Sequence, residues 1–159
     1  MAKDIRHTFH ITAAEDEVVR ALLDPGHIKS WWTREAHLDD GCLVLRWSGY
    51  GWEVALEPSW HPETHTVNWH CLRSNMQDTN AWEGTDIAFK LSPEAGGTRI
   101  DFAQTGYRES PCYETCVGGW AFFIGTSFKQ YLETGKGIPY PEMQDTGTGG
   151  GTSSINPSF

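Results

Sequence analysis

The first stretch of the chain, residues 5–12, alternates apolar and polar positions. One face of this alternation carries Ile5, His7, Phe9 and Ile11. A period of two residues is typical of a strand with one buried face, because successive side chains of a strand point to opposite sides. We therefore expect a strand here, with an inner row that is mostly apolar.

The period changes to that of a helix after residue 12. Thr12 and Glu15 have the spacing of a capping box, in which the two side chains bind free backbone amides at a helix start. Three apolar residues follow at helical spacing, Val18, Ala21 and Leu22. Pro25 and Gly26 end the run. The pattern predicts one short helix here and a second over residues 28–32.

The two-residue period returns five times between residues 41 and 105. The apolar inner positions of these runs are Leu43, Leu45, Trp47, Trp52, Val54, Leu56, Val67, Trp69, Cys71, Ile87, Phe89, Leu91, Ile100 and Phe102. Turn-forming segments separate the runs, the first two at residues 48–51 and 60–64. Residues 74–81 are a longer polar loop. We expect a long antiparallel meander.

A last, long helix is predicted over residues 111–134. Ser110 supplies a cap residue and Pro111 a proline at the first helical position, while Gly135 ends the run. Its apolar positions at helical spacing are Cys116, Val117, Trp120, Ile124, Phe128 and Tyr131 or Leu132. Residues 146–154 are all Gly, Thr or Ser and cannot bury enough apolar surface to order the chain. We expect a folded domain at 1–140 and a mobile tail at 141–159.

Composition restricts the class of protein. A chain of 159 residues suits one domain, and 12 Lys plus Arg against 21 Asp plus Glu give a net charge of −9, which disfavours nucleic acid as a partner. No segment approaches the roughly 20 apolar residues of a membrane span, and residues 1–7 do not form a signal peptide. A cytoplasmic protein with four reduced cysteines is expected.

The order of these elements, read with particular residues, resembles the START-like or SRPBCC superfamily. Within it, the chain is most similar to the group named for its homology to an activator of a heat-shock chaperone ATPase. The matching pieces are Ile11-Thr12-Ala13-Ala14-Glu15, Val18, Ala21, Leu22, Leu23-Asp24-Pro25, Trp31-Trp32, Gly97-Thr98-Arg99-Ile100, Gly119-Trp120 and Leu132-Glu133-Thr134-Gly135. The resemblance implies an α+β helix-grip fold: a curved antiparallel sheet wrapped around a long C-terminal helix, with two short helices after the first strand.

The resemblance also implies a cavity between sheet and helix. The superfamily uses this cavity for lipids, sterols, polyketides and plant hormones, and in a few branches for cyclisation or hydrolysis. Relatives often carry a histidine near the end of the late strand, where this chain has Gln104-Thr105-Gly106. Chaperone activation is not implied, because the activator proper has an additional N-terminal domain.

Aromatic residues dominate the predicted inner rows. The chain has 8 Trp, 7 Phe and 5 Tyr, and rigid rings can line a cavity and stack on flat ligands as well as fill a core. The candidate ligand-binding residues are His7, Phe9, Trp32, Trp47, Trp52, Trp69, Phe89, Phe102, Gln104, Trp120 and Phe123. His7 and Gln104 are the polar members; for His7 a structural role is the alternative.

Two motifs contain residue types that bind metals. His61, Glu63 and His65 lie around Pro62, which favours a turn, and Cys112 with Cys116 lacks a matched second pair. A zinc site needs three or four converging ligands, so we expect neither metal nor cofactor. The chain also lacks a phosphate loop, a nucleophile elbow and triad spacing.

We therefore predict non-catalytic binding of a small hydrophobic or aromatic molecule. Three alternatives stay open: a cyclase- or hydrolase-type enzyme using His7 and Glu83 in the same cavity, a chaperone-cofactor-like protein-interaction module, and a stress-responsive, self-sacrificing binder. A homodimer also stays open.

Overall fold

One antiparallel sheet forms most of the molecule, in a computed structural model that describes residues 4–106, 113–140 and 142. The strands are β1 (Ile5–Ile11), β2 (Ala36–Asp39), β3 (Cys42–Trp47), β4 (Trp52–His61), β5 (Thr66–Ser74), β6 (Asp86–Glu94) and β7 (Gly97–Thr105). The helices are α1 (Glu15–Leu23), α2 (Pro25–Trp31), the short 3-10 turn η1 (Met76–Asp78), α3 (Tyr113–Phe122), the π-helical segment η2 (Phe123–Phe128) and α4 (Lys129–Thr134).

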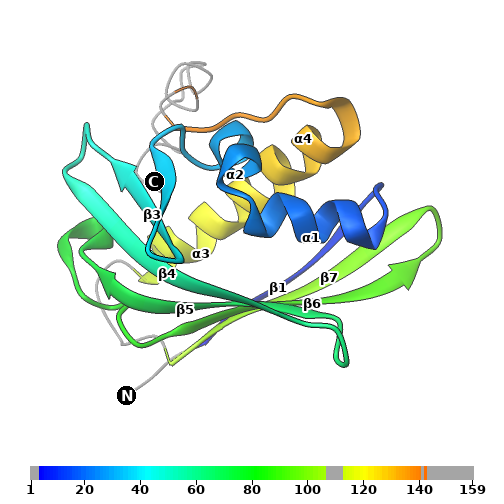
Figure 1. Cartoon of the computed structure of the whole chain (residues 1–159), viewed down its shortest axis with the longest axis horizontal. Helices are drawn as coiled ribbons and strands as arrows, with labels where there is room; N and C mark the ends of the chain where they lie inside the picture. Colours follow the sequence, from blue (N-terminus) through cyan, green and yellow to red (C-terminus); the bar gives the residue numbers. More distant parts are fainter. Residues whose placement is uncertain (1–3, 107–112, 141, 143–159) are drawn as a thin grey trace.

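The strand order is β1-β7-β6-β5-β4-β3-β2, so β2 to β7 form a continuous meander and β1 pairs with the last strand. Every pairing between the strands is antiparallel in the described part of the chain. The curved sheet wraps around the last helix, and α1 and α2 lie on the same side of the sheet as that helix (Figure 1). The predicted α+β helix-grip fold is confirmed.

One strand of the sheet, β2, was not predicted from the sequence. It has four residues, and only Ala36 is buried while Leu38 is 52% exposed. Such a short edge strand has no repeated alternation that the sequence could reveal. It is defined instead by its pairing with β3, in which Ala36 lies opposite Leu45.

The predicted capping box at the first helix is wrong. Helix α1 begins two residues later than the box requires, with Ala14 as its cap residue and no side-chain cap. The backbone amide of Thr12 donates instead to Glu133 at 2.8 Å. The second helix does have a side-chain cap, because Asp24 accepts from the amide of Gly26 at 2.8 Å.

The last helix follows the predicted course over residues 113–134; its predicted start at 110–112 lies outside the described residues. The backbone stays right-handed helical through Phe122 and Lys129, at both ends of η2. Gly135, with φ +91°, ends the helix in the left-handed conformation that glycine adopts without strain.

The π-helical segment was not predicted. It contains Gly125, where a Cβ atom would lie 3.0 Å from the ring of Phe9.

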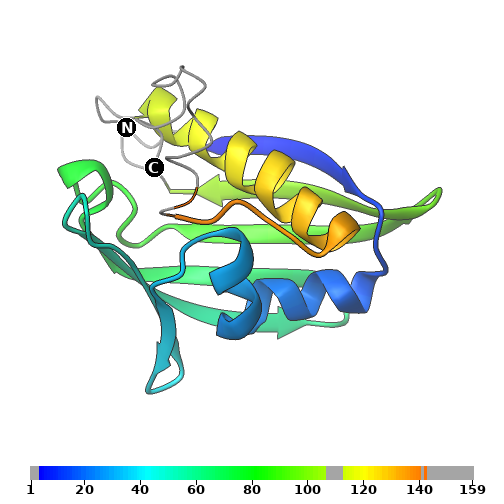
Figure 2. The same cartoon turned by 90° about the horizontal axis from the view of Figure 1, so that it is seen from above.

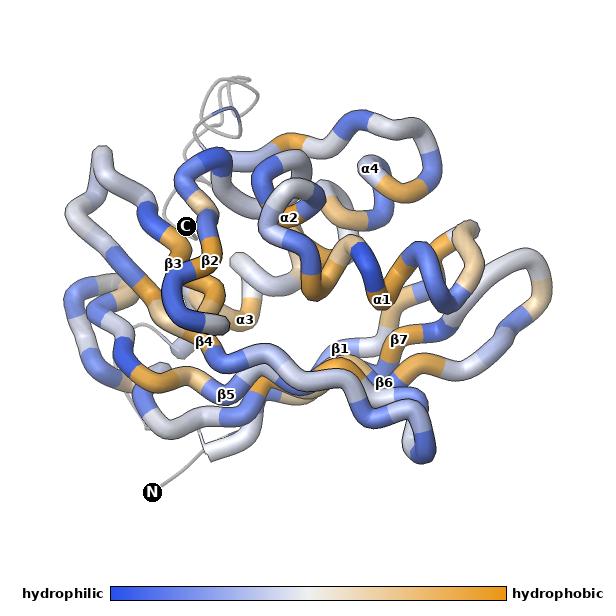
Figure 3. Tube along the Cα trace, viewed as in Figure 1, coloured by the Kyte–Doolittle hydropathy of each residue, from blue (hydrophilic) through white to orange (hydrophobic). Residues whose placement is uncertain are grey.

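The core lies between the sheet and the helices. Apolar segments occur where strands and helices face each other, and the tip of the β4–β5 hairpin is hydrophilic (Figure 3).

The described fold includes Tyr140, which is 4% exposed, and Glu142, which pairs with Arg34. The division into a domain at 1–140 and a mobile tail at 141–159 stays a prediction, since 141 and 143–159 are outside the described residues. No helix in the described ranges combines the length and apolarity needed to cross a membrane.

Candidate functional site

Three tryptophans stack at the centre of the core. Trp31 and Trp32 come from the end of α2 and Trp69 from β5, and all three are 0% exposed. The centroid of the Trp32 ring lies 5.5 Å from that of Trp31 and 5.3 Å from that of Trp69, with interplanar angles of 9° and 13°. Because α2 ends at Trp31, Trp32 leaves the helical path, and both rings reach the same strand.

A second stack joins the first through Trp32. Trp82 and Trp120 lie 5.3 Å apart at 16°. The ring of Trp120, on α3, lies 5.3 Å from Trp32 and 4.8 Å from Phe102. Trp32 also meets Trp47 edge-on at 5.6 Å. The rings of Trp31, Trp32, Trp47, Trp69, Trp82 and Trp120 are called the tryptophan cluster below.

Most of the predicted binding residues meet in or beside this cluster. Those in the surrounding core are Phe9, Phe89, Phe102, Gln104 and Phe123. Trp52 is also buried, but it stacks on Tyr50 at 4.4 Å and its indole donates to Asp78 at 3.3 Å. It therefore lies beside the cluster and does not stack within it.

Two members of the cluster were missed in the sequence-based set, Trp31 and Trp82. Trp31 lies three residues after Ile28, a helical spacing that could have identified both as buried. Trp82 follows η1 in a region without a periodic pattern. Its burial depends on contact with Trp120 of the last helix, and that contact is not visible in the local sequence.

The indole N–H groups of the central stack differ in whether they have a hydrogen-bond acceptor. Trp31 donates to the carbonyl of Ala21 at 2.9 Å, and Trp69 donates to that of Leu22 at 3.1 Å. The Nε1 atom of Trp32 is fully buried and has no hydrogen-bond partner among the described residues. A buried donor left without an acceptor costs about 1–3 kcal/mol, so this group is an unusual feature of the central stack.

Gln104 is the buried polar residue next to the cluster. Its side-chain oxygen accepts from the Trp120 indole at 2.9 Å, and its amide nitrogen donates to the Thr85 hydroxyl at 3.1 Å. The Thr85 hydroxyl in turn donates to the carbonyl of Trp82 at 2.7 Å. Gln104 therefore holds the second stack in place through both of its ends.

His7 lies at the margin of the core. Its Nε2 atom is 3.1 Å from the carbonyl of Val117, so this nitrogen carries the proton and donates. The ring is half-buried and lies 5.4 Å from Phe9 and 6.0 Å from Phe102. His7 thus connects β1 to α3.

Glu83, the other titratable residue of the alternative enzyme site, accepts a hydrogen bond from the amide of Ser74 at 3.2 Å.

Three described pockets open at the surface. Their volumes are about 300, 370 and 240 Å³. The second is lined by His7 and Phe102, with Arg6, Thr8 and Asp101, along the β1 edge of the sheet. None of the three is lined by a tryptophan. The rings of the cluster lie next to one another, with centroid distances of 5.3–6.4 Å.

The histidines around Pro62 have separate partners. The turn predicted at residues 60–64 is present at residues 62–65, because β4 continues through His61. His61 contacts the Ser59 hydroxyl at 3.0 Å, whereas His65 lies 2.9 Å from the carboxylate of Glu15. Within the described ranges no three His, Cys, Asp or Glu side chains converge on a metal-sized site.

The cysteine pair can be assessed only in part, because Cys112 lies outside the described residues. Cys116 is buried. Cys71 is also buried, and burial together with the charge of Glu83 raises the pKa of its thiol to about 12. A thiol with this pKa stays protonated and is a poor nucleophile and metal ligand at neutral pH.

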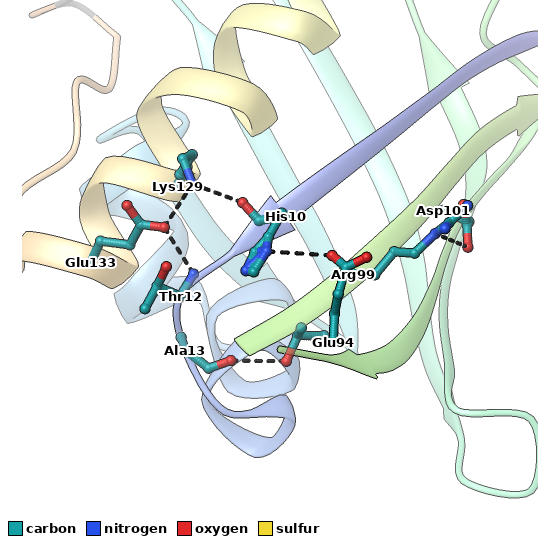
Figure 4. A network of polar contacts seen from close by, with 9 residues as sticks. His10, Thr12, Ala13, Glu94, Arg99, Asp101, Lys129 and Glu133 are labelled. Atoms are coloured by element: carbon teal, nitrogen blue, oxygen red, sulfur yellow. Dashed lines mark hydrogen bonds and ion pairs between the residues drawn. The ribbon is translucent and has the colours of Figure 1, made fainter. Parts of the chain in front are cut away.

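A polar network fixes the last helix to the end of β1 (Figure 4). Lys129 donates to the carbonyl of His10 and to the carboxylate of Glu133, both at 2.8 Å. Glu133 also accepts from the amide of Thr12, and these bonds hold its pKa below the ordinary value. The network fixes one end of the helix above the sheet and includes no member of the tryptophan cluster.

Comparison with solved structures finds proteins with the same architecture. The solution structure of the Aha1 dimer from Colwellia psychrerythraea is 26% identical, with a TM-score of 0.71, over 85% of this chain and 99% of that chain. A START superfamily protein from Mycobacterium smegmatis is 11% identical, with a TM-score of 0.60. The match covers 82% of this chain and 97% of that chain.

A third structure, DynU16 from the dynemicin biosynthetic locus, is 22% identical with a TM-score of 0.59. The match covers 84% of this chain but 48% of DynU16, so this chain corresponds to about half of that protein. No protein-family model and no curated protein matches the chain.

Proposed function

We propose that this chain, a START-like helix-grip protein with an Aha1-type relationship, binds a small, flat, largely apolar molecule that carries one hydrogen-bond acceptor. The molecule would lie against the tryptophan cluster and accept a hydrogen bond from the indole of Trp32. The observation that carries this proposal is the fully buried, unpartnered Nε1 atom of Trp32. A cytoplasmic location is part of the proposal.

Physical chemistry favours this class of ligand. A carbonyl or ether oxygen placed at Trp32 would remove the cost of the unpaired donor, which gives the bound state an advantage that a purely apolar molecule lacks. The near-parallel planes of Trp31, Trp32 and Trp69 favour a flat aromatic molecule over a flexible acyl chain, because rings stack at low entropic cost. The fold is also shared with a START superfamily protein and DynU16.

Fluorenone and fluorene provide a matched pair of probes. They have the same flat tricyclic shape, and fluorenone adds one carbonyl. Quenching of tryptophan fluorescence should give a Kd for fluorenone about fivefold lower than for fluorene, the equivalent of one net hydrogen bond of about 1 kcal/mol. In Trp32→Phe, which keeps an aromatic ring but lacks the N–H, the two probes should bind equally.

Trp31→Phe is the matched control, because that indole already donates to Ala21. It should keep the preference for fluorenone even if both affinities change. Equal binding of the two probes by the wild-type protein would refute the role of Trp32 as a donor, and no binding of either probe would refute the ligand site.

A protein-interaction role is the second candidate, since a similar structure is that of an Aha1 dimer. A homodimer of this chain is therefore a proposal that sedimentation velocity can test. The exposed large apolar residues in the described part are Leu38 and Leu72. They lie on β2 and β5, with β3 and β4 between them in the sheet, so they do not form one apolar patch.

A further inference from the structure

We infer that residues 136–140, the segment after the last helix, are a lid over Trp32 that must lift to admit the ligand. This inference rests on the proposed function of the tryptophan cluster. The segment, called the strap below, runs from the end of α4 back across α2 towards β3 (Figure 2). It has no regular secondary structure apart from one bridge between Tyr140 and Thr33.

The strap binds the backbone on either side of Thr33. The amide of Tyr140 donates to the carbonyl of Trp32 at 2.8 Å, and the carbonyl of Tyr140 accepts from the amide of Arg34 at 3.0 Å. The indole of Trp32 is a buried donor without a partner among the described residues. The strap therefore fixes the backbone of the proposed ligand-binding residue directly.

The middle of the strap lies in close contact with α2. A Cβ atom at Gly137 would lie 2.5 Å from the carbonyl oxygen of Ser30 and 3.0 Å from the Cα atom of Trp31. These are backbone atoms, which cannot move aside as a flexible side chain can. The amide of Ile138 donates to the Ser127 hydroxyl, which donates to the carbonyl of Trp31 at 2.6 Å. Glycine at 137 is thus required for the closed position.

The end of the strap is anchored by its side chains. The Tyr140 hydroxyl accepts from the amide of Gly49 at 2.6 Å, and the ring is buried next to Tyr50. Beyond it, Glu142 forms two hydrogen bonds with the guanidinium of Arg34. The exposed pair contributes little to stability, whereas the buried Tyr140 ring is the main anchor.

The strap is a wall of the core without regular secondary structure apart from its bridge to Thr33. Continuous ladders of backbone hydrogen bonds hold the sheet together from β1 to β2, and Lys129 and Glu133 fix the last helix at its C-terminal end, next to the start of the strap. A segment held by a few bonds opens locally at a lower free energy than a packed strand or helix. None of the three described pockets is lined by a residue of the cluster, and such an opening would admit a ligand to it.

The lid model predicts faster ligand entry when the strap is displaced. If the site is accessible only in the open form, the observed association rate scales with the open fraction. Gly137→Ala prevents close contact with α2, and Tyr140→Phe removes the hydroxyl that accepts from Gly49 while it keeps the ring. Lys136→Ala is the control, because that side chain is exposed at the start of the strap.

Stopped-flow tryptophan fluorescence with fluorenone tests the lid. Both Gly137→Ala and Tyr140→Phe should bind fluorenone about tenfold faster than the wild type, and Lys136→Ala should not. Hydrogen exchange at the amides of Arg34 and Tyr140 should accelerate in the same two variants, which shows that the strap has lifted, and unchanged exchange in the sheet shows that the fold is intact.

The outcomes separate the lid from the binding site. Fluorenone binding at unchanged rates in both variants, with faster exchange of the strap amides, would overturn the lid and leave the proposed function standing. No binding by any protein in the set would overturn the proposed function and the lid with it.

Discussion

The side-chain oxygen of Gln104 accepts a 2.9 Å hydrogen bond from the indole of Trp120, and both residues are fully buried. The bond joins the end of β7 to the last helix. The other end of the same amide donates to Thr85. A single polar side chain in the core therefore positions the Trp82–Trp120 stack next to Trp32.

Replacement of Gln104 by leucine should destabilise the protein. The change leaves the Trp120 indole and the Thr85 hydroxyl without one partner each, at about 1–3 kcal/mol for each buried group. Urea unfolding followed by circular dichroism measures the loss. Gln130→Leu, at a half-buried position on α4, is the control and should cost less. A Gln104→Leu protein as stable as wild type would contradict a structural role for this bond.

The fold was predictable where the sequence repeats a short period. Ile87, Phe89 and Leu91 are buried as the alternation requires, and Gly135 ends the last helix as predicted. Strand β2 is too short to show a period. The capping box failed because Thr12 binds Glu133, a residue 121 positions away, and this tertiary contact replaces the local one.

The candidate site was predictable only in part, for a related reason. The inner rows of the strands identified Trp47, Trp69 and Phe102, because strand alternation places them on one face. The special position of Trp32 was not predictable, because its unpaired donor depends on which acceptors surround it in three dimensions. The strap was also missed, since its hydrogen bonds with Trp32 and Arg34 connect segments about a hundred residues apart and leave no local pattern.

The unpaired indole should be visible in stability measurements. Trp31→Phe breaks a bond to Ala21, whereas Trp32→Phe removes a donor that has no partner. Both rings are fully buried and lose the same volume, so Trp32→Phe should be less destabilising, by about 1–3 kcal/mol. Paired urea titrations measure the difference. Equal losses of unfolding free energy, or a larger loss for Trp32→Phe, would contradict the assignment of an unpaired donor.

Acid should weaken the network at the end of the last helix. Hydrogen bonds from Lys129 and Thr12 lower the pKa of Glu133 below its ordinary 4.5. A lowered pKa in the folded state stabilises the protein above pH 4.5, and this contribution disappears as the pH falls through the folded-state value. Glu133→Gln should therefore lower the Tm at neutral pH, and the difference from wild type should shrink as the pH drops below 4.5. A constant difference would argue against the ion pair.

The cysteines should differ in reactivity. Burial and the charge of Glu83 raise the pKa of Cys71 to about 12, while Cys42 is partly exposed. Iodoacetamide reacts with thiolates, so at mildly alkaline pH it should modify Cys42 in the native protein and Cys71 only after unfolding in urea. Mass spectrometry of the tryptic peptides distinguishes the two sites. Equal native rates would show that the core opens around Cys71.

The proposed function requires the indole N–H of Trp32 to donate a hydrogen bond to the acceptor of the ligand. The most direct test is the indole region of a ¹⁵N-correlated NMR spectrum, which resolves the N–H signals of the 8 tryptophans, with the Trp32 signal assigned from the spectrum of Trp32→Phe. Saturation with fluorenone should move the Trp32 proton downfield, as expected for a new hydrogen bond, and saturation with fluorene should not. A Trp32 signal that stays in place while fluorenone saturates the protein would contradict the claim.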